Sequence, residues 1–267
     1  FMIKVVKERP TNINEDILNI CVGTHNGIFH CDEVVAISIL SILMKKVGNI
    51  FVIRSRDLRF LEKNTDLLVD IGGGEFDHHQ KGGNGKRENG IEYASAGLVW
   101  KEFGNRLIST FADNMLSLEE ISSIANIVDQ NIIQSVDMED NGQLVSSHPF
   151  QFITSFLPSW NKESNYDEKF EQCVNVVSMT LENMIESYVS LYLAKKEISS
   201  RKSKFYIFFK QKKYTNTSEK FEEYLHSRGF NCIQTRNVLV KDFYRPVKQS
   251  ENVLQVFLFG ENRIAAN

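Results

Sequence analysis

A long apolar segment between short strand-like runs constrains the fold of this chain more than any other feature. Residues 17–24 alternate apolar and polar positions, as a half-buried strand does, and residues 51–53 and 67–71 are further short apolar runs. Residues 32–46 are almost continuously apolar and too long for a strand, so they predict a buried helix with Asp32 as its N-cap. A strand, a helix and a strand at this spacing form a βαβ unit with parallel strands. We therefore expect an α/β fold with a parallel sheet.

The rest of the chain predicts helices, followed by a second group of strands. Expected helices cover residues 94–106, a segment from Ser117 to about Asp137, and residues 166–198. Expected strands cover residues 204–209, 230–234 and 253–259, and residues 1–16 are expected to be an irregular lead-in. This pattern divides the chain into a main domain over residues 1–160, a helical linker over residues 161–200 and a small α/β lobe over residues 201–267.

Composition is that of an ordinary globular protein. The 267 residues are 42% hydrophobic and 24% charged, and the net charge of -3 argues against a uniformly basic nucleic-acid binder. No apolar run approaches the roughly 20 residues of a membrane span, so we expect no membrane partner. The four cysteines lie far apart in the sequence, which favours a reducing, intracellular compartment. The first residues show no secretory pattern.

The stretch after the third apolar run supplies the clearest candidate site. Asp70 lies near the end of that run, and glycines at 72–74 let the backbone turn tightly before Asp77, His78 and His79. Carboxylate and neutral imidazole suit manganese, iron and zinc. Turns and helix caps would explain single aspartates, but they do not explain two adjacent histidines beside glycines. We therefore favour a metal site.

A second set of candidate ligands, His25, His30 and Asp32, follows the first expected strand. Open α/β sheets bind ligands beyond the carboxyl ends of their strands, so both sets converge if the two strands are neighbours. Cys31 could be a zinc ligand with His30, but the partner cysteines of structural zinc sites are absent. We favour Cys31 as a small residue packed behind the site.

Basic residues in two places are candidate contacts to a phosphate-bearing substrate. Lys81, Lys86 and Arg87 lie in the glycine-rich loop after the histidine pair. Residues 195–214 interleave basic and aromatic side chains, which suits nucleic acid. For that second stretch we favour the alternative, a helix end followed by a half-buried strand with a solvated lysine face.

Several segments carry a family resemblance when taken together and in order. They are residues 25–33, 70–73, 76–80, 93–100, 136–142 and 157–161. They resemble the DHH phosphoesterase superfamily and, more specifically, the Myg exonuclease family, over roughly residues 18–200. In superfamily relatives the first motif carries His, Asp and Asp, whereas here His30 stands in the place of the first aspartate.

The resemblance implies a metal-binding catalytic domain with a DHH-type parallel sheet and flanking helices. It also implies a long linker helix and a small C-terminal lobe that helps to bind substrate. It implies a phosphoesterase with two divalent ions, usually Mn²⁺, that hydrolyses RNA or short oligonucleotides from the 3′ end. Mg²⁺ and Zn²⁺ suit the same ligand types. Family members resemble nuclear and mitochondrial proteins, and a homo-oligomer is compatible with the sequence.

On this basis we expect two metal-ligand sets that share one aspartate. The first set is His25, His30 and Asp70. The second set is Asp32, Asp70, His78 and one of Asp137 and Asp140. From the residues alone, Asp140-Asn141-Gly142 is typical of a turn, and only the resemblance makes Asp137 and Asp140 ligand candidates.

Two further residues are expected to take part in catalysis without binding metal. Asp77 would orient a neighbouring imidazole, and His79 would contact the phosphate.

One alternative function is a phosphatase for pyrophosphate or short oligonucleotides. Another is a catalytically weak metal- or nucleotide-binding regulatory module, because residues 259–267 lack the paired glycines expected of the family's second lobe.

Overall fold

The computed structural model describes residues 3–11, 17–143, 147–159, 161 and 165–200 and three later strands, with side chains up to residue 196. The chain divides into two compact units, Phe1–Val189 and Ser190–Asn267. The first unit holds nearly all of the residues that the sequence marks as candidate site residues.

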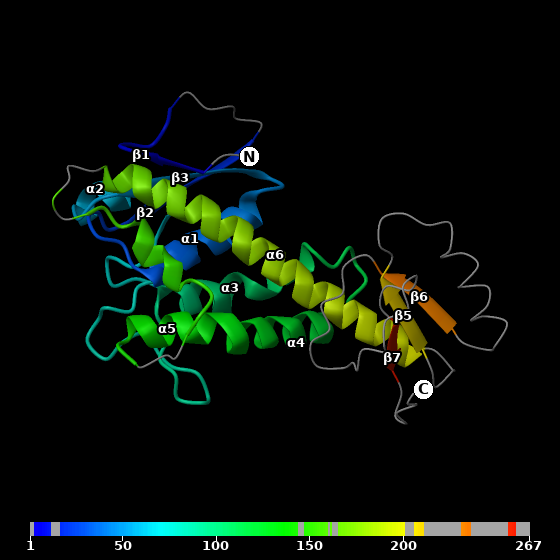
Figure 1. Cartoon of the computed structure of the whole chain (residues 1–267). Coiled ribbons are helices and arrows are strands. Elements are labelled where there is room, and N and C mark those ends of the chain that lie inside the picture. The colour runs from blue at the N-terminus through cyan, green and yellow to red at the C-terminus, as the bar shows by residue number, and fades with distance from the viewer. Residues whose placement is uncertain are drawn as a thin grey trace. The chain divides into compact units, whose positions relative to one another are not determined.

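A four-stranded parallel sheet in the order β1-β3-β2-β4 lies on one side of the first unit (Figure 1). The strands are β1 (Ile3–Val6), β2 (Leu18–Thr24), β3 (Gly48–Arg54) and β4 (Leu67–Leu68). The predicted α/β fold with a parallel sheet is confirmed. The expectation of an irregular lead-in is wrong over β1, which pairs with β3 at the edge of the sheet. The polar residues around β1 hid it, because an edge strand keeps much of its surface in water.

The described α-helices are α1 (Cys31–Met44), α2 (Leu58–Asn64), α3 (Ser95–Ser109), α4 (Leu118–Val128), α5 (Gln134–Asp140) and α6 (Tyr166–Ser200). Of these, α1 and α2 pack on opposite faces of the sheet. A π-helical turn (Asp129–Ile133) joins α4 to α5, and a 3-10 helix (Gln151–Phe156) precedes α6. α1 lies between the sheet and the layer of α3 and α5 (Figure 1). The sequence analysis missed α2, which is short and has only one fully buried residue, Leu61.

The burial of α1 explains its almost unbroken apolar sequence. Its residues from Val34 to Leu40 are all buried, because the sheet covers one side and helices cover the other. On the opposite face of the sheet, α2 closes a small core of Cys21, Phe51, Ile53 and Leu61. Strand β2 therefore has apolar partners on both faces, as expected for an inner parallel strand.

α6 contributes to the first unit as far as Val189. Its buried positions recur at helical spacing and include Phe170, Val174, Val177, Leu181 and Ile185. Part of the segment that the sequence predicts as a linker therefore completes the core of the first unit.

The second unit contains a three-stranded sheet in the order β6-β5-β7. The strands are β5 (Tyr206–Lys210), β6 (Asn231–Thr235) and β7 (Val256–Phe259), with β5 parallel to β6 and antiparallel to β7. They lie close to the three strands that the sequence predicts here. Most of the basic and aromatic stretch at 195–214 falls outside the residues whose side chains are described. Among the described helices, none combines the length and apolar character needed to cross a membrane.

The start of α4 provides a test of local stability. Ser117 is the N-cap: its Oγ accepts from Glu120 N–H at 3.2 Å, and the Glu120 carboxylate accepts from Ser117 N–H at 2.8 Å. Ser117→Ala removes one of these bonds and is expected to lower the free energy of unfolding by about 1 kcal/mol in urea titrations. Ser123→Ala, at an exposed position of the same helix, is the control. Equal effects of the two changes would contradict the capping role.

Candidate metal centre

The loop from β2 to α1 carries the first candidate ligands. β2 ends at Thr24, and His25 follows directly with a buried side chain. Gly27 adopts a left-handed conformation with φ +85°, which turns the chain back toward α1. His30 is the N-cap of α1, and its backbone N–H donates to the Glu33 carboxylate at 2.8 Å.

The prediction that Asp32 caps α1 is wrong. The helix begins at Cys31, because the Glu33 carboxylate satisfies the backbone of His30 and fixes the cap at that residue. Asp32 is instead the second helical residue, and its side chain is fully buried. Its carboxylate is therefore available to the site. Acidic side chains in a first helical turn are stabilised by the helix dipole.

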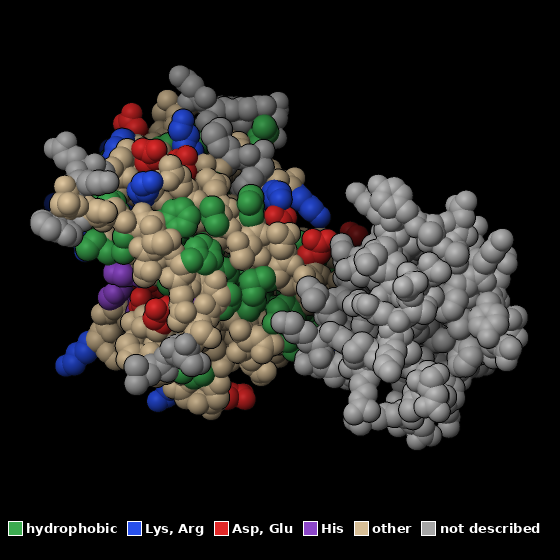
Figure 2. All heavy atoms as spheres, in the orientation of Figure 1, with side chains coloured by type: hydrophobic (Ala, Val, Ile, Leu, Met, Phe, Trp, Pro, Cys, Tyr) green, Lys and Arg blue, Asp and Glu red, His purple; other side chains and the backbone are tan. Residues whose placement is uncertain are grey.

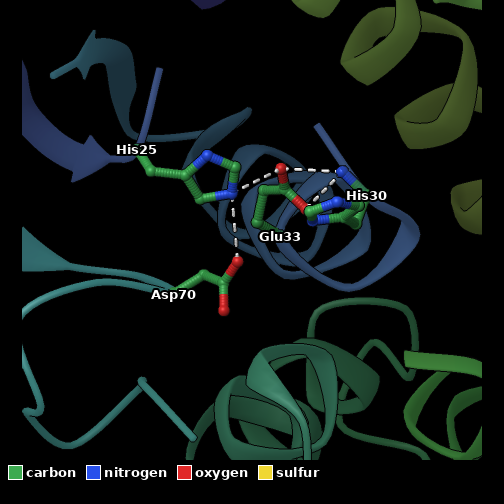
Figure 3. Close-up of side chains that lie close together, drawn as sticks. All are labelled: His25, His30, Glu33 and Asp70. Carbon is green, nitrogen blue, oxygen red and sulfur yellow. Dashed lines mark hydrogen bonds and ion pairs between the residues drawn. The ribbon is translucent and has the colours of Figure 1, made fainter. Parts of the chain in front are cut away.

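Four side chains meet around His25 Nε2 (Figure 3). This atom lies 3.2 Å from Glu33 Oε1 and 3.3 Å from Asp70 Oδ2. The His30 ring lies 5.7 Å from the His25 ring, centroid to centroid. One ligand atom from each of His25, His30, Glu33 and Asp70 lies within 4.8 Å of all the others. This group could hold a metal ion.

Asp70 lies at the centre of the cluster. It follows β4, its backbone N–H donates to Phe76 O, and its φ of 59° is in the left-handed region. Such a conformation is uncommon outside glycine and is often found at functional sites. Its carboxylate accepts from Ser95 Oγ at 3.0 Å and lies near both His25 and His78.

A second group forms around His78. Its Nε2 lies 3.0 Å from Asp140 Oδ2, 3.5 Å from Asp70 Oδ1 and 3.6 Å from Asp32 Oδ2. Asp140 and Asp32 also form a candidate metal group with His30. Residues from α1, α5 and the loop after β4 thus meet at one place, although they lie far apart in the sequence. Figure 2 shows histidine side chains at the surface near acidic ones.

Asp77 lies behind the exposed ring of His79. Its carboxylate accepts from the backbone N–H of Gly73 at 2.6 Å and of His79 at 3.0 Å. Its Oδ1 also lies 2.9 Å from His79 Nδ1. The His79 side chain is 61% exposed, and its Nδ1 also lies 3.3 Å from Asp70 Oδ1, so His79 forms a further candidate metal group with Asp70 and His78. Asp77 thus orients the His79 ring through Nδ1, and it is not in any of the candidate metal groups of the described residues.

The sequence analysis missed two residues of the site, Glu33 and Ser95. Glu33 is fully buried and belongs to the group around His25. Its position three residues after His30 is the spacing of a capping box, which could have suggested its contact with the start of α1. Ser95 begins α3 and donates its backbone N–H to Asp32 and its hydroxyl to Asp70. Its only signal in the sequence is its position at the start of a predicted helix.

Asp137 and Asp140, which the sequence could not separate, have different surroundings. Asp137 is fully buried, its Oδ2 lies 2.8 Å from Arg87 Nη1, and its Oδ1 accepts from Gly97 N–H at 2.9 Å. Burial raises the pKa of Asp137 to about 7, although Arg87 and the Gly97 N–H act in the opposite direction. Of these two aspartates, only Asp140 contacts His78.

The three cations of the glycine-rich loop also differ. Arg87 is buried, its guanidinium forms a bidentate pair with Asp129 at 2.6 and 2.8 Å, and it stacks on Tyr93 at 4.3 Å. Together with its contact to Asp137, this makes Arg87 a structural cation rather than the phosphate contact that its loop position suggested. Lys81 and Lys86 are exposed. Both remain accessible to a substrate.

Buried carboxylates shift the pKa values of the groups in the cluster. Burial alone would lower the pKa of His25, but the adjacent carboxylates of Asp70 and Glu33 raise it to about 10. Burial would likewise lower the pKa of His78, but Asp140 and Asp70 raise it to about 10. Burial and the neighbouring Asp70 raise the pKa of Asp32 well above its usual range. Protons on these groups therefore offset the negative charge that bound cations would otherwise offset.

Three buried atoms of the cluster support the same interpretation. Asp32 Oδ1, Asp70 Oδ2 and His78 Nε2 are buried and have no hydrogen-bond partner among the described residues. Buried polar atoms without partners are uncommon, and each needs an explanation. Carboxylate oxygens and an imidazole nitrogen that face one another suit a divalent ion. The residues present therefore fit a bound metal.

Comparisons with known proteins find related sequences but no significant match among solved structures. The profile of MYG1_exonuc, described as an uncharacterised protein family (UPF0160), matches residues 21–220. A MYG1 protein of Schizosaccharomyces pombe is 30% identical over 178 residues, which are 59% of this chain and 54% of the relative. The MYG1 exonuclease of Homo sapiens is 28% identical over 200 residues, which are 64% of this chain and 52% of the relative. The chain spans about half the length of the curated relatives it matches.

The buried pairs of Arg87 lead to a prediction about stability. Arg87→Met leaves the Asp137 carboxylate buried without its cation and is expected to lower the free energy of unfolding by about 3–5 kcal/mol in urea titrations. Lys86→Met, at the exposed neighbouring position, should change it by no more than about 0.5 kcal/mol. A loss below about 1 kcal/mol for Arg87→Met would contradict the structural role.

Proposed function

The chain belongs to the MYG1 exonuclease family (UPF0160), and from this premise we propose that it is a divalent-metal-dependent exonuclease that hydrolyses RNA phosphodiester bonds from the 3′ end. Relatives from mouse and human carry the name MYG1 exonuclease, which supports a nuclease with a nucleic acid substrate. The observation that carries the proposal is the shared carboxylate of Asp70, which belongs to two of the candidate metal groups.

We assign the first set of metal ligands from the candidate group around His25, and the second set from the carboxylates that lie near His78. The first ion would be held by His25, His30, Glu33 and Asp70. The second would be held by Asp32, Asp70, His78 and Asp140. Asp140 is preferred to Asp137 because the carboxylate of Asp137 is already paired with Arg87 and the Gly97 amide. Mn²⁺ is the ion we expect, since oxygen and imidazole ligands without sulfur suit it.

Bound cations would activate a water molecule as nucleophile and offset charge on the phosphate oxygens. The protein's own groups prepare the site for that chemistry. Ser95 donates to both Asp32 and Asp70 and so holds the two central carboxylates in place. These bonds do not compete for Asp70 Oδ2, which lies toward His25.

Substrate contact is assigned to the exposed groups around the cluster. Asp77 fixes Nδ1 of His79, so Nε2 of that ring is the atom that can meet a phosphate oxygen. Lys81 and Lys86 supply exposed positive charge on the same loop system. Phosphate contacts of this kind attract a nucleic acid backbone without reading its sequence.

The test follows the products that the protein releases from three substrates with Mn²⁺. A 5′-labelled RNA should give a ladder of shortened products. Orthophosphate from pyrophosphate alone would indicate a phosphatase, cleavage restricted to a dinucleotide would indicate a small-oligonucleotide enzyme, and no product at all would indicate a binding module. Only the first outcome supports the proposal.

The shared aspartate provides the matching variant. Asp70→Asn keeps the size and tolerates the left-handed backbone, but it removes the charge that both groups need, so hydrolysis should fall by about 10³-fold or more. Glu62→Gln, an exposed carboxylate-to-amide change in α2, should leave the rate unchanged. Near wild-type activity of Asp70→Asn would exclude the scheme.

Metal binding should depend on pH because of the two protonated histidines. The pKa values of His25 and His78 are about 10 without cations, so both rings carry protons at neutral pH and must lose them to bind metal. The apparent Mn²⁺ affinity should therefore rise with pH below about pH 10, by up to ~100-fold per unit. Calorimetric titrations in two buffers of different ionisation enthalpy measure the protons released. An affinity that does not change with pH would contradict the assignment.

A further inference from the structure

We propose that Cys31, Glu139 and His148 form a zinc site that is separate from the candidate metal centre. One ligand atom from each of these three residues lies within 4.8 Å of the other two. Cys31 is the first residue of α1, Glu139 lies in α5, and His148 lies between α5 and the 3-10 helix. The sequence analysis treated Cys31 as a packing residue or as a partner of His30, whereas the fold groups it with two residues more than a hundred positions away.

The ligand chemistry favours zinc. A thiolate, an imidazole and a carboxylate are a common mixture for Zn²⁺, whereas Mn²⁺ prefers oxygen-rich sites. The His148 side chain is fully buried, and the Glu139 side chain is 44% exposed. Three protein ligands leave one tetrahedral position, which solvent can fill from the side of Glu139.

This group is distinct from the metal centre, although the two are adjacent in the sequence. Its three residues are absent from the groups that contain His25, Asp70 and His78. It is also the only candidate group of the described residues that contains sulfur. Cys31 is followed by Asp32, and Glu139 is followed by Asp140. An ion held by Cys31 and Glu139 would therefore fasten the start of α1 to the end of α5, next to both of those aspartates.

Zinc binding would rearrange protons within this group. Without zinc, His148 Nδ1 accepts from Phe150 N–H at 3.2 Å, so the proton of a neutral ring is on Nε2 and points to Glu139. Binding of zinc to Nε2 moves the ring proton to Nδ1, breaks the contact with Phe150 and releases the thiol proton of Cys31 to solvent. One neutral hydrogen bond stabilises a protein far less than a structural zinc ion does, so binding remains favourable.

Cobalt is a suitable probe because a thiolate bound to Co²⁺ gives a charge-transfer band in the near ultraviolet. The candidate metal centre offers no sulfur, so the band would report a cysteine ligand and not an ion at that centre. Equimolar Co²⁺ added to the reduced, metal-free full chain should produce the band, and equimolar Zn²⁺ should abolish it. No band in the wild-type chain would overturn the proposal.

Variants identify the ligands. Cys31→Ser should abolish the band, and Cys173→Ser, at a buried free cysteine outside the proposed site, should retain it. Glu139→Gln, at a half-exposed side chain that folding tolerates, should weaken Co²⁺ binding by about tenfold or more. Asp70→Asn should retain the band whether or not the proposed nuclease function holds. A band that survives Cys31→Ser, or binding that Glu139→Gln leaves unchanged, would also overturn the proposal.

Discussion

The structure around the site depends on one buried carboxylate. Asp70 lies between His25 and His78, accepts the hydroxyl of Ser95 and belongs to two candidate metal groups. Burial alone would raise the pKa of Asp70, but the two adjacent histidines hold it below its usual range. A buried negative charge needs positive partners on every accessible side. The loops after β2 and β4 supply those partners, and the parallel pairing of β2 with β4 brings the two loops together.

Much of this arrangement could be predicted from the sequence. The alternation in β2 and the apolar run of α1 predict a βαβ unit, and the polar residues just past the strands predict where ligands meet. Carboxyl ends of parallel strands lie at one edge of a sheet whatever the details of packing. The sequence therefore predicts that His25 and Asp70 are neighbours if their strands are adjacent, and β2 does pair with β4.

Other parts of the site could not be predicted, for physical reasons. Glu33 and Asp32 are consecutive acidic residues at a helix start, where either could be a cap, and only the backbone geometry assigns the capping contact to Glu33. Arg87 looks like a mobile loop cation, and its burial depends on Asp129 and Asp137, which are more than forty positions away. β1 is a four-residue edge strand followed by polar residues, and so short an apolar run carries little signal. For Arg87 and β1 the deciding contact is distant in the chain, whereas for Glu33 it is local but depends on where the helix starts.

The backbone at Asp70 has a consequence for the choice of amino acid there. With φ at 59°, the position suits glycine, asparagine and aspartate far better than residues with longer or branched side chains. Of the two acidic amino acids, aspartate is the one that visits this conformation readily. Glutamate would carry the same charge but would strain the main chain and extend one methylene too far. At this position, the backbone conformation and the required negative charge together select aspartate.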